Sequence, residues 1–194
     1  TDDPRELDAA LRAGERSWSE QPYYGQRYGA RGRGFTRSDS AWLVTLASAP
    51  PSVREGQIDW LARVLAARGM PRLLLERHLL ALHDELVKSS PERAARYGPL
   101  TAAARKLADE RRAHVSDAGL TELARRFDER VGAELAAALP HVGELIAAAV
   151  ADERAGVAQA VASLTAWLSD RGRFSSRWID AVHATIAEAR ANAE

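Results

Sequence analysis

The chain has 194 residues, in which 27 basic side chains balance 27 acidic ones, and it contains no cysteine. A chain of this length can bury a substantial hydrophobic core without help from a metal or cofactor. Its zero net charge argues against attraction to nucleic acid or to a membrane surface. The lack of cysteine excludes disulfides and thiol catalysis, and no apolar run approaches the roughly 20 residues that span a bilayer. We therefore expect a soluble, cytoplasmic protein that does not enter membranes.

The N-terminal part of the chain predicts two helices with an unusual segment between them. Residues 4 to 17 form the first predicted helix, in which Pro4 suits the first helical position. A short apolar helix is predicted from Ala41 to Ala47. Between them, residues 18 to 35 contain one tryptophan, three tyrosines, one phenylalanine, four glycines and three arginines. This composition makes the segment the first candidate site.

The clearest helical pattern lies in residues 56 to 88, which predict two amphipathic helices joined at a tight corner. Gly69 suits a helix end because it can take a positive φ, and Pro71 presets the φ of the next first turn. The apolar stripes of the two helices are Ile58, Leu61 and Leu65, followed by Leu75, Leu79, Leu82 and Leu86. We expect the rest of the fold to pack around this hairpin.

The C-terminal half also carries helical patterns. Gly98 and Pro99 are expected to interrupt a helix that starts near residue 92. Ser116 can cap a helix that extends to residue 131, and a long alanine-rich stretch covers residues 141 to 168. No segment alternates with a period of two for long enough to predict a sheet.

These patterns predict an all-α protein of about seven or eight helices, packed as a globin-like or orthogonal bundle in a single domain of residues 1 to 194. The corners at Gly69 and Gly172 align when the chain is set over itself, with apolar positions matching on both sides. This match suggests an internal duplication with halves 1 to 99 and 100 to 194.

The histidines do not have the spacing of a metal site. The chain has five, at positions 78, 83, 114, 141 and 183. His78 and His83 are separated by about 140° around a helix, and no HExxH or ExxH pattern occurs. His78 lies between Leu75 and Leu82 at the core edge, where it is either an axial haem ligand or a boundary histidine bonded to a neighbour. No metal-binding set is predicted.

Sequence fingerprints of catalysis are also absent. The chain has no GxxxxGK[ST], GxGxxG after a strand, or GxSxG motif. Its acidic residues lie on polar helix faces near arginines, as in solvated ion pairs. We therefore predict no catalytic residues and a protein that is not an enzyme.

Residues 23 to 37 allow three interpretations. Their arginines and aromatic rings could stack on bases and contact phosphates, as in a nucleic-acid-binding module. They could instead form an aromatic wall with guanidinium groups for a planar ligand that bears carboxylates, such as a tetrapyrrole. The structural alternative is that arginine stems and rings cover the edge of the core, with the glycines forming turns.

Two stretches carry a family resemblance: residues 27 to 33, RYGARGR, with Asp39 and Trp42, and residues 60 to 82 around the Gly69 corner. They resemble the helical sensor regions that accompany cobalamin-binding modules in bacterial regulators, including non-haem globin-like photosensor domains. The similarity covers roughly residues 20 to 88 and implies an all-α ligand-sensing or dimerising domain in a signalling system. The Asp-x-His-x-x-Gly cobalamin-ligand motif is not present.

Together these observations predict a non-enzymatic sensory or regulatory domain of bacterial signal transduction. It would bind a small hydrophobic ligand, with a tetrapyrrole (bilin, haem or cobalamin) as the candidate cofactor, and form a homodimer. The alternative is a protein- or nucleic-acid-interaction module that uses residues 23 to 37, of which the nucleic-acid version is disfavoured by the balanced charge. The predicted ligand-binding residues are Tyr24, Arg27, Tyr28, Arg31, Phe35, Trp42, Trp60 and His78.

Overall fold

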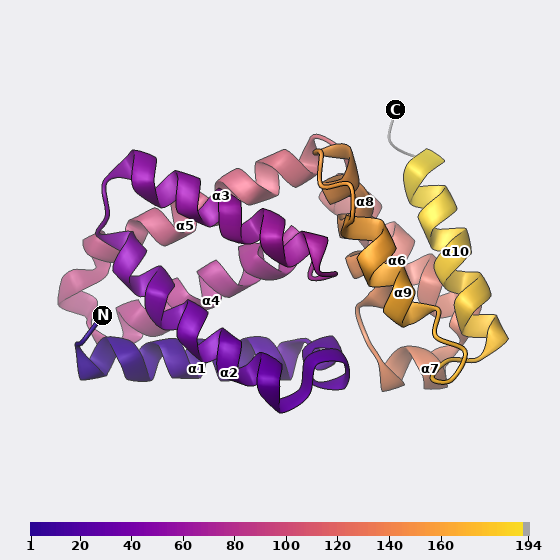
Figure 1. Cartoon of the computed structure of the whole chain (residues 1–194), viewed down its shortest axis with the longest axis horizontal. Coiled ribbons are helices and arrows are strands. Elements are labelled where there is room, and N and C mark those ends of the chain that lie inside the picture. Colours follow the sequence, from indigo (N-terminus) through magenta and orange to yellow (C-terminus); the bar gives the residue numbers. More distant parts are fainter. Residues whose placement is uncertain (192–194) are drawn as a thin grey trace. The chain divides into compact units, whose positions relative to one another are not determined.

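The structure is a computed structural model that describes residues 1 to 191. These residues form ten α-helices and one short 3-10 helix and contain no strand, which confirms the all-α class (Figure 1). The helices number ten where the sequence predicted seven or eight, because breaks in the chain divide several long apolar stretches. Among the described residues, no helix combines the length and apolar character that crossing a bilayer demands.

Two compact units make up the chain. Unit 1 comprises Thr1–Leu61 and Leu74–Leu107, and unit 2 comprises Ala62–Leu73 and Ala108–Glu194. The units differ from the sequence halves 1 to 99 and 100 to 194, because unit 2 includes a short segment around the Gly69 corner.

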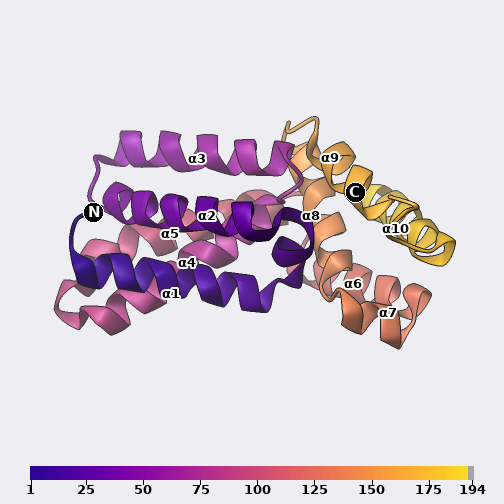
Figure 2. The same ribbon diagram turned by 60° about the horizontal axis from the view of Figure 1, so that its bottom comes forward.

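Unit 1 is built on the pair α1 (Pro4–Glu20) and α2 (Pro22–Ala47), which pack against each other and lie side by side in both views (Figures 1 and 2). It also contains residues 51 to 61 of α3 (Pro51–Ala67), residues 74 to 89 of α4 (Arg72–Ser89), the 3-10 helix η1 (Pro91–Arg93) and residues 94 to 107 of α5 (Ala94–Arg112). The side chains with no exposed area in its core include Leu43, Leu79, Leu82, Leu86, Tyr97 and Leu100.

Unit 2 contains α6 (Asp117–Val131), α7 (Ala133–Ala138), α8 (Val142–Arg154), α9 (Ala160–Leu168) and α10 (Ser176–Ala191). The helices α6, α8 and α10 pack against one another in pairs. At Gly143 of α8, an added Cβ would lie 2.5 Å from the Cα of Ala124 in α6, so only glycine permits this close crossing.

The predicted corner after α3 is confirmed. Gly69 has a φ of 84°, and its N–H bonds the carbonyl of Ala66 at 2.9 Å. The N–H of Met70 bonds the carbonyl of Leu65 at 2.9 Å, which completes a glycine-terminated helix end. Sequence signals of this kind depend only on neighbouring residues, so they survive in the folded chain.

Two local predictions are wrong. Residues 22 to 47 form one helical element, broken only at Gly29, where the sequence predicted a short helix from Ala41 to Ala47 and left glycine turns as one alternative for the preceding segment. Pro99 lies inside α5 and does not interrupt it. The alanine-rich stretch 141 to 168 is divided into α8 and α9, with Gly156 at a φ of 91° between them. Helix packing outweighs the local preference of proline at Pro99, whereas the breaks at Gly29 and Gly156 use the positive φ that glycine allows.

Candidate ligand-binding groove

A groove between α1 and α2 is the candidate site in unit 1. Its volume is about 630 Å³, which is within the range of about 300 to 1,000 Å³ typical of small-molecule sites. The residues that line it are Leu11, Glu15 and Trp18 of α1 and Gly25, Gly29, Ala30, Arg33, Gly34 and Arg37 of α2. The groove therefore lies in the aromatic and arginine-rich segment that the sequence singled out.

The α2 wall of the groove is largely bare backbone. Gly29 has a φ of 54° and a ψ of −154°, a conformation that interrupts the helix and that residues with a Cβ rarely adopt. At Gly25 and Gly34 an added Cβ would meet no atom within 4 Å. The space is open because these glycines have no side chains. It lies at the surface of α2 and is not a cavity in the core.

The α1 wall is held rigid by Trp18. Its ring stacks on Tyr24 with centroids 5.5 Å apart, and the Arg33 guanidinium lies 4.8 Å from its centroid on the indole. The indole N–H donates to the hydroxyl of Thr36 at 3.0 Å. These contacts fix the indole, and such aromatic and cation contacts contribute about 0.5 to 1.5 kcal/mol each.

The charges of the groove leave one arginine without a partner. Arg33 forms an ion pair with Glu15. Arg37, one helical turn further along the same face, is exposed and makes no hydrogen bond or ion pair with any residue that the structure describes. Because Glu15 neutralises one of the two arginines, the lining carries a net charge of one positive unit from these three residues.

None of the eight predicted ligand-binding residues lines the groove. Tyr24 supports its wall through Trp18, and burial raises the pKa of the Tyr24 hydroxyl, so this group stays neutral. Arg27 lies over the rings of Tyr23 and Tyr28, at 5.7 and 5.1 Å from their centroids. These side chains hold α2 in place beside the groove.

The remaining aromatic residues of the prediction lie apart from one another. Phe35 is 58% exposed, and the Arg31 guanidinium lies 5.7 Å from the centroid of its ring. Trp42 is half-buried in α2. Trp60 is 57% exposed, because the buried face of α3 is formed by Ile58, Leu61 and Ala62.

His78 lies in the core of unit 1 with both ring nitrogens engaged. Its Nδ1 is 2.9 Å from the hydroxyl of Ser17, and its Nε2 is 2.9 Å from the hydroxyl of Ser40. Burial lowers the pKa of His78 to about 4. The ring therefore has no free nitrogen for a haem iron, and this arrangement fits the alternative of a histidine bonded to its neighbours.

The predicted ligand-binding residues do not include those that line the groove, although Arg33 and Arg37 belong to the arginine-rich segment 23 to 37. Gly25, Gly29, Arg33 and Arg37 recur every four residues, as positions on one face of a helix do. This spacing is the sequence signal for the groove, but glycines also suit turns, which makes the helical pattern hard to recognise. No group of three or more potential metal ligands occurs in the part of the chain that the structure describes.

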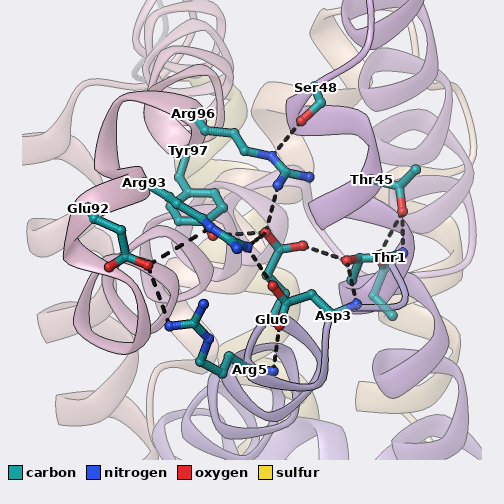
Figure 3. A network of polar contacts seen from close by, with 11 residues as sticks. Thr1, Asp3, Arg5, Glu6, Thr45, Ser48, Glu92, Arg93, Arg96 and Tyr97 are labelled. Carbon is teal, nitrogen blue, oxygen red and sulfur yellow. Dashed lines mark hydrogen bonds and ion pairs between the residues drawn. The ribbon is translucent and has the colours of Figure 1, made fainter.

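A second polar cluster surrounds Glu6, which is 1% exposed (Figure 3). Tyr97 donates to its carboxylate at 2.9 Å, and Arg96 lies at 3.0 Å from the same oxygen. Arg93 lies 3.5 Å from that oxygen and also pairs with Asp3. The cluster ties the start of α1 to α5, and its polar groups are paired with one another.

Comparisons of the chain with models of protein families, with curated proteins and with solved structures find no match.

Proposed function

We propose that the chain is a non-enzymatic sensory or regulatory domain that binds a flat hydrophobic ligand in the groove between α1 and α2. The observation that carries this proposal is the groove of about 630 Å³, whose α2 wall is largely bare backbone. A flat ligand can lie against such a wall without displacing side chains. Leu11 and the edge of Trp18 supply apolar contact on the other side.

The groove favours binding over catalysis. Its one acidic lining residue, Glu15, is exposed and paired with Arg33, and no histidine, serine or threonine lines it. A general acid or base needs a titratable group within hydrogen-bonding reach of the substrate. The lining offers apolar surface and cations, which suits recognition of a ligand.

Among tetrapyrroles, a metal-free open-chain bilin agrees best with these residues. Both ring nitrogens of His78 bond serines, so iron coordination would require breaking one of these bonds. The exposed Arg37 of the groove can pair with a propionate group that a bilin carries. Cobalamin has no matching ligand motif in the sequence.

Visible absorption spectra after incubation with biliverdin, haemin and cobalamin test this proposal. We expect a shifted band with biliverdin that is lost in Gly34→Leu, because the leucine side chain extends into the open groove. Gly56→Leu is the matched control, since Gly56 also faces open space but lies on α3 outside the groove. Unchanged spectra in the wild type with all three compounds would reject the tetrapyrrole. Equal loss of the biliverdin band in Gly34→Leu and Gly56→Leu would show that the groove is not the binding site.

The second candidate is an interaction module that uses residues 23 to 37. The exposed pair of Arg31 and Phe35 supports it, because a cation beside an accessible ring can stack on a base or a partner side chain. Binding to generic RNA or DNA at low and high salt tests the nucleic-acid version, since phosphate contacts strengthen steeply at low salt. No binding at low salt would reject it.

The proposal also includes a homodimer acting in the cytoplasm, and a globin-like arrangement of the helices. One exposed stripe supports the dimer: Val53 and Trp60 lie two turns apart on one face of α3, at 49% and 57% exposure. Light scattering coupled to size exclusion gives the test. We expect the wild type to be a dimer and the Trp60→Arg variant to be a monomer. A monomeric wild type would reject the proposed homodimer.

A further inference from the structure

We infer that the ligand of the groove is a flat organic anion, and that Arg37, not Arg33, binds its negatively charged group. This inference rests on the proposed binding function and adds the ligand's charge and the residue that selects it. It follows from the different surroundings of the two arginines that line the groove.

Arg33 is committed to protein contacts. It forms an ion pair with Glu15, and its guanidinium lies over the Trp18 ring at 4.8 Å from the centroid. A ligand anion that paired with Arg33 would have to compete with the Glu15 carboxylate and would meet its negative charge. Arg33 therefore forms part of the groove wall.

Arg37 has neither of these constraints. It lines the same groove four residues further along α2, which places its Cβ roughly 5 to 6 Å from that of Arg33. It makes no hydrogen bond or ion pair with the described residues, so its guanidinium donors are available to a carboxylate or sulfonate. The excess positive charge of the lining is located at this residue.

The glycines determine the shape of the ligand. Gly25, Gly29 and Gly34 lie on the α2 wall, and an added Cβ at any of them would meet nothing within 4 Å. A flat ring system can rest on this backbone surface with its acidic group at Arg37. The groove thus accepts an aromatic anion and discriminates against the neutral compound of the same shape.

A pair of fluorescent probes separates charge from shape. The anion 8-anilinonaphthalene-1-sulfonate and the neutral N-phenyl-1-naphthylamine share the same ring system, and only the first carries a sulfonate. We expect Arg37→Gln to weaken binding of the anionic probe about tenfold and to leave the neutral probe within about twofold. Arg37→Lys keeps the charge and should retain most of the affinity for the anion.

One control isolates the residue. Arg63→Gln removes the same charge from an exposed position on α3 outside the groove, so it should change neither affinity.

The outcomes distinguish this inference from the proposed function. If Gly34→Leu leaves both probes bound as in the wild type, the groove is not the site and both proposals are wrong. If Gly34→Leu removes both probes but Arg37→Gln affects them equally, or no more than Arg63→Gln does, the groove stands and the inference about Arg37 is wrong.

Discussion

His78 is neutral in the folded protein, and its hydrogen bonds identify the tautomer. Ser40 donates its hydroxyl proton to the carbonyl of Thr36 at 2.6 Å, so the same oxygen accepts from His78. Nε2 then carries the proton, and Nδ1 accepts from Ser17. A second proton on Nδ1 would remove its ability to accept the hydrogen bond from Ser17, and the ring is buried, so the charged form is disfavoured.

This arrangement predicts that stability falls as the medium becomes acidic. The pKa of His78 is about 4 in the folded state, against roughly 6.5 when unfolded. Between these values the unfolded chain binds more protons, so the free energy of unfolding decreases as pH falls from about 6.5 to 4, by about 3 kcal/mol in total. Urea unfolding at a series of pH values measures this decrease in the free energy of unfolding.

The control for this prediction is a second histidine of α4. His83→Gln changes a histidine that is only partly buried and should keep the slope of the wild type in this pH range. His78→Gln should lower stability at pH 7 but flatten the slope. An equal slope in both variants would contradict the assignment of the titration to His78.

At the scale of the helices, Gly143 and Gly29 are both required, but for different reasons. At Gly143 the requirement is space, because α6 and α8 cross with backbone atoms in contact. At Gly29 the requirement is conformation, because the backbone takes a positive φ while space around it is open. The two positions therefore make separate predictions.

Gly143→Ala should destabilise unit 2. The added Cβ would lie 2.5 Å from the Cα of Ala124, so α6 and α8 must separate, at a cost of about 1 to 3 kcal/mol. Gly56→Ala, on the open face of α3, should be neutral or stabilise by up to about 1 kcal/mol. Thermal unfolding of both variants measures the difference, and equal melting temperatures would show that α8 can shift freely.

Gly29→Ala should destabilise α2 through strain. The φ of 54° with ψ of −154° is costly for alanine, by about 1 to 3 kcal/mol. Gly34→Ala, in the helix of the same groove wall, has neither strain nor a clash and should be neutral or slightly stabilising. Circular dichroism melts compare them. A more stable Gly29→Ala variant would mean that α2 can straighten through residue 29.

At the scale of the molecule, unit 2 depends on a segment that is distant in sequence. Arg72, from the segment 62 to 73, is 5% exposed and donates from its backbone N–H and its Nε to Asp152, at 2.8 and 2.7 Å. Its Nη1 donates to Glu110 at 2.6 Å. Asp152 is 1% exposed, and Arg72 is its hydrogen-bond partner, with the charge of Arg111 acting on it as well.

Asp152→Ala should therefore be strongly destabilising. It leaves the Arg72 charge buried with only the partly exposed Glu110, which costs about 3 to 5 kcal/mol. Asp59→Ala breaks a half-exposed pair with Lys106 and should cost less than about 1 kcal/mol. Urea unfolding followed by far-ultraviolet circular dichroism compares the two. Similar losses in both variants would show that the buried pair contributes no more than a surface one.

The predicted internal duplication concerns the whole molecule, and two glycines outside the corners bear on it. Gly29 and Gly132 have φ values of 54° and 89° and are separated by the same number of residues as Gly69 and Gly172. Their surroundings differ, because an added Cβ at Gly132 would meet the Arg177 guanidinium at 3.3 Å, while Gly29 faces open space. If the halves are related, only the first has kept an open groove at this glycine.

The sequence by itself determined the features that neighbouring residues control. The helical class, the corner at Gly69 and the cap at Ser116, whose hydroxyl accepts from the N–H of Gly119 at 3.0 Å, follow from periodicity and short-range hydrogen bonds. Such preferences act within one or two turns, so they can be recognised before the fold is known. The segment that contains the groove was also identified from its composition.

Only the tertiary structure decided which side chains meet. His78 bonds two serines that are 61 and 38 residues away, and Trp18 contacts Arg33 across a helix boundary. The groove exists because α1 packs against the glycine face of α2, and Trp60 is exposed because α3 buries its other face. These outcomes depend on burying apolar area across elements, which no local pattern specifies.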